Sequence, residues 1–304
     1  MKKHNLIIGV ALSLLLALPS TTLLAEEAYL AVSQAASSNQ VSANQSTTAI
    51  QTETQFGTES ENRRDGGYLD LGVGLVERSK LAGFNELPSG IAWFVNARYQ
   101  KNGFYLEFPH GSYREQETVL TFGYNFYNSE NWSFDLHHSM NHGDLTYEFA
   151  DNENSKKIEI EREGGSEIGL RIGGVFERSE VQFIVANASG AGGLYAGAWW
   201  THHRQYQNFN FSFSLGAQYR NEKVMQYYYG SGVGGEKATI SLPEYEGKAG
   251  IEYTTQISMS YPLSESLVLE SFIRYKELPS DVSKSAVFTK DSQTTAAVLI
   301  KYVF

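Results

Sequence analysis

The chain contains no cysteine among its 304 residues. That absence excludes disulfide bonds, thiolate metal sites, a cysteine nucleophile and a lipid-anchored cysteine near the N-terminus. A dense run of lysine and arginine is also lacking, and the formal net charge is −10, so the composition argues against nucleic acid as a partner. We expect the excess of acidic residues to lie in solvated loops.

An apolar run long enough for a membrane-spanning helix, about 20 residues, is missing as well. The apolar run at 6–18 is shorter, follows Lys2 and Lys3, and is followed by a small-residue stretch that ends at Ala25. This arrangement is typical of a secretory signal peptide, which we predict over residues 1–25. A mature helical membrane protein is therefore not expected.

Residues 26–66 have almost no aromatic side chains and are rich in Ser, Gln, Thr, Asn and Ala. They show no sustained periodicity of a helix or of a strand. Such a segment buries too little apolar surface to offset the entropy of ordering it. We therefore predict a disordered periplasmic extension, with a tether as its simplest role and partner binding as the alternative.

The sequence is rich in glycine and aromatic residues: 28 glycines, 19 tyrosines and 17 phenylalanines stand beside only 6 prolines. This mixture favours extended segments, tight turns and aromatic surfaces. From Tyr68 onward, segments of roughly ten residues alternate between apolar and polar positions, which is the period of a β-strand. The segments 209–220 and 251–261 show the alternation most clearly. The fold class is therefore predicted to be all-β.

The same alternation along the chain predicts about twelve strands. They are expected at 67–78, 89–100, 103–113, 116–127, 130–142, 166–178, 180–190, 193–206, 208–220, 249–262, 266–277 and 293–304. Short turns alternate with longer loops, of which 143–165, 221–248 and 278–292 are the longest. An even strand count with alternating connections is typical of bacterial outer-membrane barrels, whose short turns face the periplasm. Residues 67–304 are thus predicted to form a closed, antiparallel, up-and-down transmembrane β-barrel with both of its ends on the periplasmic side.

A soluble β-sandwich would also alternate, but it would bury its apolar face. In this chain, aromatic residues recur at the ends of the predicted strands, as they do in the aromatic girdles of membrane barrels. The candidates are Tyr99, Phe126, Tyr127, Trp132, Tyr206, Tyr219, Tyr261, Tyr275 and Tyr302. This distribution favours the barrel over the sandwich.

The last segment of the chain alternates up to its final residue, with Ala296, Val298, Ile300, Tyr302 and Phe304 on one face. A terminal strand that ends in an aromatic residue resembles the signal read by the outer-membrane barrel assembly machinery. The resemblance implies that Tyr302 and Phe304 form the membrane-assembly signal. Outer-membrane lipid and the assembly machinery are then expected partners.

Charged residues of both signs fall on the faces that we assign to the barrel interior. The candidate lumen-lining residues are Arg98, Glu107, Asp135, Glu167, Arg171, Glu252, Glu270, Arg274 and Lys301, with Asp70 and Asn96 beside them. Buried charges are tolerated only where they pair or stay hydrated. Twelve strands also enclose more room than the eight that side chains can fill. The interior is therefore predicted to be either crossed by ion pairs or a narrow water-filled pore.

Catalytic chemistry has one candidate cluster, at the predicted strand 130–142. It comprises His137, His138, Ser139, His142 and Asp144. A nucleophile and base need mutual geometry, and no nucleophile-bearing motif accompanies these residues. We therefore predict no enzymatic activity and no cofactor.

A metal site is not expected either. His202 and His203 are sequence neighbours, and neighbouring strand positions point to opposite faces, so the two imidazoles cannot readily share one metal ion. The glycine-rich stretches at 190–193 and 230–235 lack the Lys-Ser/Thr ending of a phosphate-binding loop. They are interpreted as loop glycines.

The C-terminal third resembles the MltA-interacting protein family (MipA/OmpV). The matching stretches are Met-Gln-Tyr-Tyr-Tyr-Gly at 225–230, Ser-Leu-Pro-Glu-Tyr-Glu-Gly-Lys-Ala-Gly at 241–250, Tyr-Pro-Leu-Ser at 261–264 and the segment 275–288. The sequence departs from the family pattern in having Ser-Leu-Pro for Gly-Leu-Pro and Ser-Asp-Val at 280–282 for Gly-Asp-Ala. Over 68–220 the resemblance rests on the strand pattern alone.

This resemblance implies a protein of the Gram-negative outer membrane. The family implies a non-enzymatic scaffold that links a murein hydrolase to a murein synthase. Some members look like porins, adhesins or surface antigens. The sequence therefore leaves three functions open: a scaffold, a small passive or gated pore, and a surface adhesin.

Overall fold

The computed structural model describes residues 65–79, 89–109, 120–142, 145–151, 156–162, 165–188, 191–230, 236–238, 245–285 and 290–304. The predicted signal peptide lies outside these residues, as does the predicted extension 26–66 except for its last two positions. The predicted strand ends at 110–113 and 116–119 also fall outside them.

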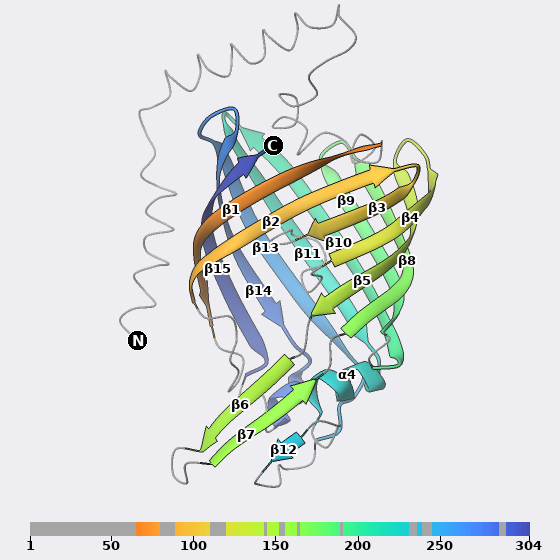
Figure 1. Cartoon of the computed structure of the whole chain (residues 1–304), viewed down its shortest axis with the longest axis vertical. Helices are drawn as coiled ribbons and strands as arrows, with labels where there is room; N and C mark the ends of the chain where they lie inside the picture. The colour runs from red at the N-terminus through yellow and green to blue at the C-terminus, as the bar shows by residue number, and fades with distance from the viewer. Residues whose placement is uncertain are drawn as a thin grey trace, which may run out of the picture.

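Twelve of the described strands form one closed antiparallel barrel (Figure 1). They are β1 (Gly66–Arg78), β2 (Gly90–Lys101), β3 (Phe104–Pro109), β4 (Leu120–Asn128), β5 (Trp132–His142), β8 (Gly165–Phe176), β9 (Ser179–Ala188), β10 (Gly193–Tyr206), β11 (Phe209–Arg220), β13 (Gly250–Pro262), β14 (Leu267–Glu277) and β15 (Ser292–Val303). The first and last strands pair directly, from Asp70 opposite Val303 to Arg78 opposite Thr295. The predicted twelve-stranded antiparallel barrel is therefore confirmed.

The alternating apolar and polar residues of each strand point to opposite faces of the barrel wall. On β11 the outward Leu215 is 43% exposed, whereas its inward neighbour Ser214 is 3% exposed. On β13 the outward Ile257 is 57% exposed and the inward Gln256 only 1%. Large apolar side chains thus cover the outside and polar ones the inside, the reverse of a water-soluble barrel. Such a wall is stable only where the outer solvent is itself apolar.

Short turns gather at the end of the barrel that carries the start of β1 and the end of β15, here called the turn end (Figure 1). The connection between β2 and β3 has two residues, Asn102 and Gly103, whose φ angles are +52° and +83°. Two consecutive residues with positive φ form the hairpin turn whose twist matches that of the flanking strands, and Asn-Gly is its preferred sequence. This pair therefore sets the register of β2 against β3.

The opposite end, here called the loop end, carries structure that the sequence analysis treated as loops. A separate three-stranded sheet consists of β6 (Leu145–Asp151), β7 (Lys156–Arg162) and β12 (Glu236–Ala238). The loop after β11 contains the helix α4 (Glu222–Tyr229), and the loop after β14 contains the short 3-10 helix η2 (Ser280–Lys284). Within the part of the chain that the structure describes, no helix has the length and apolar character that a membrane crossing requires.

Describing 143–165, 221–248 and 278–292 simply as loops was therefore incomplete. The helix α4 has 8 residues, too few for a helical period to stand out in the sequence. Its start is nevertheless marked by Asn221, whose side chain accepts a hydrogen bond from Val224 N at 3.1 Å.

Candidate functional site: the barrel interior and its loop-end cap

A network of ion pairs crosses the interior in the half nearer the turn end. Arg98 on β2 is paired with Glu107 on β3, its direct neighbour in register, and also donates to Gln100 Oε1 at 2.8 Å. Arg171 on β8 donates from Nη1 to Glu107 Oε2 at 2.7 Å and from Nε to Asp135 Oδ2 at 3.0 Å. Both carboxylates therefore have arginine partners, which offsets the cost of removing them from water.

The ring of Tyr105 lies at the centre of this network. The guanidinium carbons of Arg98 and Arg171 lie 5.0 and 4.9 Å from its centroid, within the range of cation–π contacts. On the neighbouring strand, a Cβ on Gly123 would lie 2.5 Å from the Tyr105 hydroxyl oxygen, so only glycine leaves room for the ring. The sequence analysis did not single out Tyr105. Its position two residues before Glu107, on the same face of the strand, is the signal that could have identified it.

A second group of polar contacts joins β1, β2, β14 and β15. Lys301 Nζ lies 2.5 Å from Glu270 Oε2 and 3.8 Å from Asp70 Oδ2, and Asn96 Nδ2 donates to the same Asp70 oxygen at 3.1 Å. Four strands are thus linked on their inner face near the seam where the first and last strands meet.

The remaining candidate lumen residues also lie on the inner face. Arg274 donates from Nε to Gln256 Oε1 at 2.8 Å, and Glu167 is 1% exposed on β8. Glu252 is fully buried at the loop end. The structure thus places all nine candidates on one face of the wall but divides them among separate groups along the barrel.

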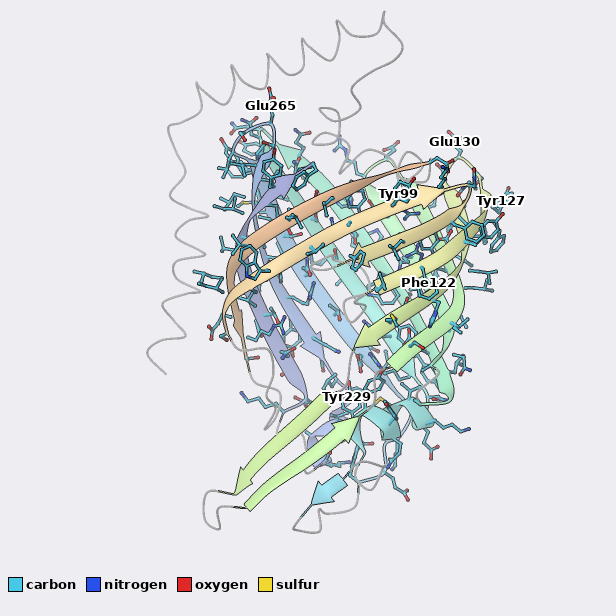
Figure 2. All side chains as sticks on the ribbon, viewed as in Figure 1. Tyr99, Phe122, Tyr127, Glu130, Tyr229 and Glu265 are labelled. Atoms are coloured by element: carbon cyan, nitrogen blue, oxygen red, sulfur yellow. The ribbon has the colours of Figure 1, made fainter. Side chains whose placement is uncertain are left out.

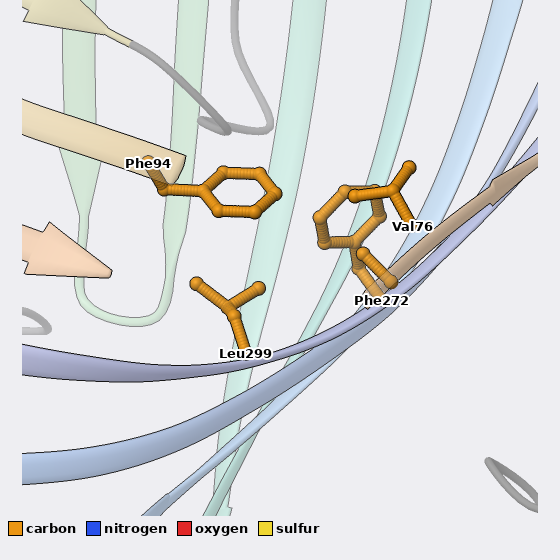
Figure 3. Packing of buried hydrophobic residues seen from close by; sticks show 5 residues of the cluster. Val76, Phe94, Phe272 and Leu299 are labelled. Atoms are coloured by element: carbon orange, nitrogen blue, oxygen red, sulfur yellow. The ribbon is translucent and has the colours of Figure 1, made fainter. Parts of the chain in front are cut away.

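Part of the inner face is apolar. Val76, Phe94, Phe272, Ala297 and Leu299 form a buried cluster on β1, β2, β14 and β15, and Figure 3 shows four of them converging inside the wall. A strict assignment of apolar residues to the outer face and polar residues to the inner face is therefore wrong for the loop-end half of these strands. The reason is that both faces are apolar there, so the sequence period carries no information about direction.

At the loop end, the carboxylate of Glu252 binds partners from three elements. Arg220 Nε on β11 lies 3.0 Å from Oε1, and Lys276 Nζ on β14 lies 3.1 Å from Oε2. Tyr229, at the end of α4, donates its hydroxyl to Oε1 at 2.6 Å. Figure 2 shows Tyr229 where α4 meets the end of the barrel. The sequence analysis placed Glu252 in the interior but did not identify Tyr229 or Lys276 as its partners.

Three segments meet over this end of the barrel, namely 222–230, 245–249 and 278–285, which we call the loop-end cap. Gly247 N donates to Gln226 Oε1 at 2.5 Å, and Ser285 Oγ donates to the Tyr229 carbonyl at 2.9 Å. Val224 and Met225, on the buried side of α4, are 0% and 1% exposed. The cap is therefore packed against the barrel and is internally hydrogen-bonded.

Tyr245 also belongs to the cap. Burial raises the pKa of its phenol, and the nearby carboxylate of Asp281 raises the pKa further. The phenol therefore stays neutral across the physiological pH range. The cap contains much of the sequence that resembles the MltA-interacting family.

The candidate catalytic residues are divided between the two faces of β5. His137 and Ser139 are buried on the inner face, whereas His138 faces outward with its ring centroid 4.5 Å from that of Phe122. Ser139 Oγ lies 3.2 Å from Thr121 Oγ1, and among the described residues no hydrogen bond joins it to His137. The side chain of His142 and the whole of Asp144 lie outside the described residues.

The histidine pair on β10 has the expected geometry. His203 is buried on the inner face, 3.2 Å from Glu180 Oε1, whereas His202 lies outside against the ring of Trp200. In the part of the chain that the structure describes, no cluster of three or more His, Asp or Glu side chains could hold a metal ion.

The two C-terminal aromatic residues lie at the turn end. Tyr302 and Phe304 are 44% and 49% exposed, and their ring centroids lie 4.6 Å apart. Phe304 N donates to the Leu69 carbonyl on β1 at 3.0 Å, so the last residue is tied to the first strand. Tyr99 and Tyr127 are likewise exposed near this end (Figure 2).

Comparison with known proteins gives one family match. The model of the family described as MltA-interacting protein MipA matches residues 71–304, nearly the whole barrel. No curated protein sequence matches the chain significantly.

Several solved structures of porins and channels are similar to the chain at low sequence identity. The KdgM porin is 10% identical with a TM-score of 0.34, and the alignment covers 78% of this chain and 99% of that one. The NanC porin is 10% identical with a TM-score of 0.39, over 77% and 98% of the two chains. The channel DcaP of Acinetobacter baumannii is 8% identical with a TM-score of 0.36, over 78% and 96%. At such low similarity, nothing about solute or partner transfers to this chain.

Proposed function

The chain belongs to the MltA-interacting protein (MipA) family, and from this premise we propose that it is a non-enzymatic outer-membrane barrel that serves as a scaffold for murein enzymes. The partners proposed are a murein hydrolase of the lytic transglycosylase type and a murein synthase. The turn end would face the periplasm, where both enzymes meet their substrate.

The outer surface supports a membrane location. Trp93 and Ile91 on β2 are 77% and 76% exposed, and apolar side chains cover the outer face of the other barrel strands as well. In water, such an apolar surface would drive aggregation, whereas in a bilayer it contacts lipid tails, which are apolar as well. The aromatic residues near the turn end match one interfacial girdle of a membrane barrel.

The state of the interior is the observation that carries the scaffold proposal. In an open, water-filled channel, inward-facing charges stay hydrated, but Asp135 is 3% exposed, Glu167 1% and Glu252 0%. The loop-end cap is hydrogen-bonded to the same barrel through Tyr229 and Glu252 at the loop end. A barrel whose interior is packed and paired presents its turns and rims to partners, and this arrangement favours a binding role over free passage of solutes.

A pull-down with the purified, detergent-folded barrel tests this proposal. The baits are a lytic transglycosylase and a bifunctional penicillin-binding synthase, and we expect both to be retained. Charge reversal in the turns, at Glu130 and Glu265, should weaken capture, whereas reversal at Glu222 and Lys223 on the exposed side of α4 should leave it unchanged. Failure to retain either enzyme, or equal loss from both ends, would contradict the proposal.

A small gated pore is the second candidate. It is favoured by the polar inner wall of β10, β11 and β13, where Thr201, Ser214, Gln218 and Thr254 point inward. Hydroxyl and amide side chains can line a water path if the interior opens. Planar-bilayer recording tests this candidate, because a folded barrel that never conducts under voltage or osmotic stress excludes it.

A further inference from the structure

We propose that Tyr229 and Glu252 form a latch that holds the loop-end cap closed as a lid, and that breaking this contact opens the lid without unfolding the barrel. This inference concerns the barrel's own conformational states and does not depend on the scaffold role.

The latch joins one residue of the barrel wall to one residue of the lid. Glu252 belongs to the wall, with its backbone in the ladders of β13, and its charge is balanced by the wall residues Arg220 and Lys276. Tyr229 belongs to the lid and approaches the same carboxylate from the loop end. The wall residues therefore keep their ion pairs when the tyrosine leaves, so the contact can break without leaving a buried charge unpaired.

The lid moves as one body because its segments are tied to each other. Gln226 binds the backbone of Gly247, and the Tyr229 carbonyl accepts from Ser285. Val282, in η2, is fully buried within the same cap. Displacement of α4 should therefore carry 245–249 and 278–285 with it. The movement would break the Tyr229–Glu252 hydrogen bond and also separate the ring of Tyr228 from Arg220, whose guanidinium carbon lies 5.0 Å from the ring centroid.

The lid is held by fewer backbone hydrogen bonds to the rest of the fold than the strands of the wall are. Each barrel strand is hydrogen-bonded along its length to two neighbours, whereas α4 is a helix of 8 residues, a length that is marginal on its own. Packing of Val224 and Met225 supplies part of its stability. Segments with few backbone ties to the rest of the fold open at lower free energy than the core.

The Tyr229 hydroxyl donates its hydrogen bond to the carboxylate of Glu252, and hydrogen bonds to charged groups are worth more than neutral ones. Their loss corresponds to a change of about 10-fold to 100-fold in an opening equilibrium. The substitution Tyr229→Phe removes the hydroxyl and keeps the ring, so it tests the latch rather than the packing of the cap.

Because the chain has no native cysteine, a single introduced cysteine can report directly on the opening of the lid. A single thiol at Met225→Cys, on the buried side of α4, should react slowly with a membrane-impermeant maleimide in the folded barrel in lipid vesicles. With Tyr229→Phe added, we expect the labelling rate to rise by at least about 10-fold, since the reagent samples the open state. A second reporter, Thr254→Cys on the wall near Glu252, should show the same rise and covers the case in which Met225→Cys loosens the cap by itself.

The control is Glu270→Gln, which removes an inner-face carboxylate that pairs with Lys301 in the other half of the barrel, far from the lid. It should leave both labelling rates unchanged. The heat-dependent shift in electrophoretic mobility shows in every variant whether the barrel is folded. Equal labelling with and without the Tyr229 hydroxyl, or faster labelling only in samples that have lost the folded band, would overturn the latch.

Discussion

Arg171 on β8 reaches Glu107 on β3 across two intervening strands, with Nη1 2.7 Å from Oε2. The same guanidinium binds Asp135 on β5 through Nε. One cation therefore joins two carboxylates from different parts of the wall, and it does so where side chains are almost fully removed from water. The interior of this barrel is held together by charge pairing as well as by the strand ladders.

Removal of this cation should be among the most damaging single changes in the barrel. Arg171→Met keeps the length of the side chain but leaves Glu107 and Asp135 with one cationic partner fewer. Loss of one member of a buried ion pair costs roughly 3–5 kcal/mol of stability. Urea unfolding in lipid vesicles measures the change, and Arg178→Met in an exposed turn should shift the free energy of unfolding by far less.

A double substitution refines this prediction. Arg171→Met should destabilise the barrel mainly because it leaves the buried carboxylate of Glu107 with one cationic partner fewer. Combining it with Glu107→Gln, which removes that charge, should therefore destabilise the barrel by less than the sum of the two single changes. Strict additivity would show that the pair is not coupled and would contradict the network.

The last residue should matter for assembly more than for the stability of the finished barrel. Phe304 is half exposed and contacts the ring of Tyr302, so its deletion removes little buried area from the fold. We expect deletion of Phe304, or Phe304→Ala, to reduce the amount of folded barrel in the outer membrane several-fold. The unfolding midpoint of the molecules that do fold should change little.

Tyr302→Phe is the control for the terminal residue, because it preserves aromatic character on the outer face. Normal membrane assembly of the chain that lacks Phe304 would refute the assembly signal. A large drop in the unfolding midpoint of the purified variant would instead assign Phe304 a structural role.

A charged side chain on the outer face should lower the stability of the barrel more, the closer it lies to the middle of the bilayer. Val73 faces outward near the middle of β1, opposite Ile300 and Trp93 in register. At this depth, Val73→Arg should cost about 2–4 kcal/mol if the residue contacts lipid. Glu130→Arg, in an exposed turn, should be nearly neutral, and equal effects at the two positions would argue against a membrane-embedded wall.

The sequence predicted the barrel well because its signal is repeated. Each strand alternates independently, and the cases of 209–220 and 251–261 are long enough to fix the period, so all twelve barrel strands were located to within a few residues of their described bounds. The direction of the faces followed from the charges, since Arg98, Asp135 and Glu252 could not face lipid.

The loop-end cap could not be predicted from the same reasoning. Contacts such as Tyr229 with Glu252, or Ser285 with the Tyr229 carbonyl, join residues far apart in the chain and leave no periodic trace. The apolar cluster around Phe94 and Phe272 was hidden for a related reason, since a segment that is apolar on both faces does not reveal which side is inward. The pairing of Arg171 with Glu107 was likewise not predictable, because the two residues lie on strands that are not neighbours and are brought together by the closure of the barrel.

The central claim is that one face of the wall meets lipid and the other a packed interior, and the tryptophans test it most directly. Trp93 is 77% exposed on the outer face, whereas Trp199 is 3% exposed on the inner face. Single-tryptophan variants, one retaining Trp93 and the other Trp199, can be folded into vesicles that contain brominated lipids, and the quenching of fluorescence measured. We expect strong quenching of Trp93 and little of Trp199; equal quenching of the two, or none of Trp93, would contradict the account.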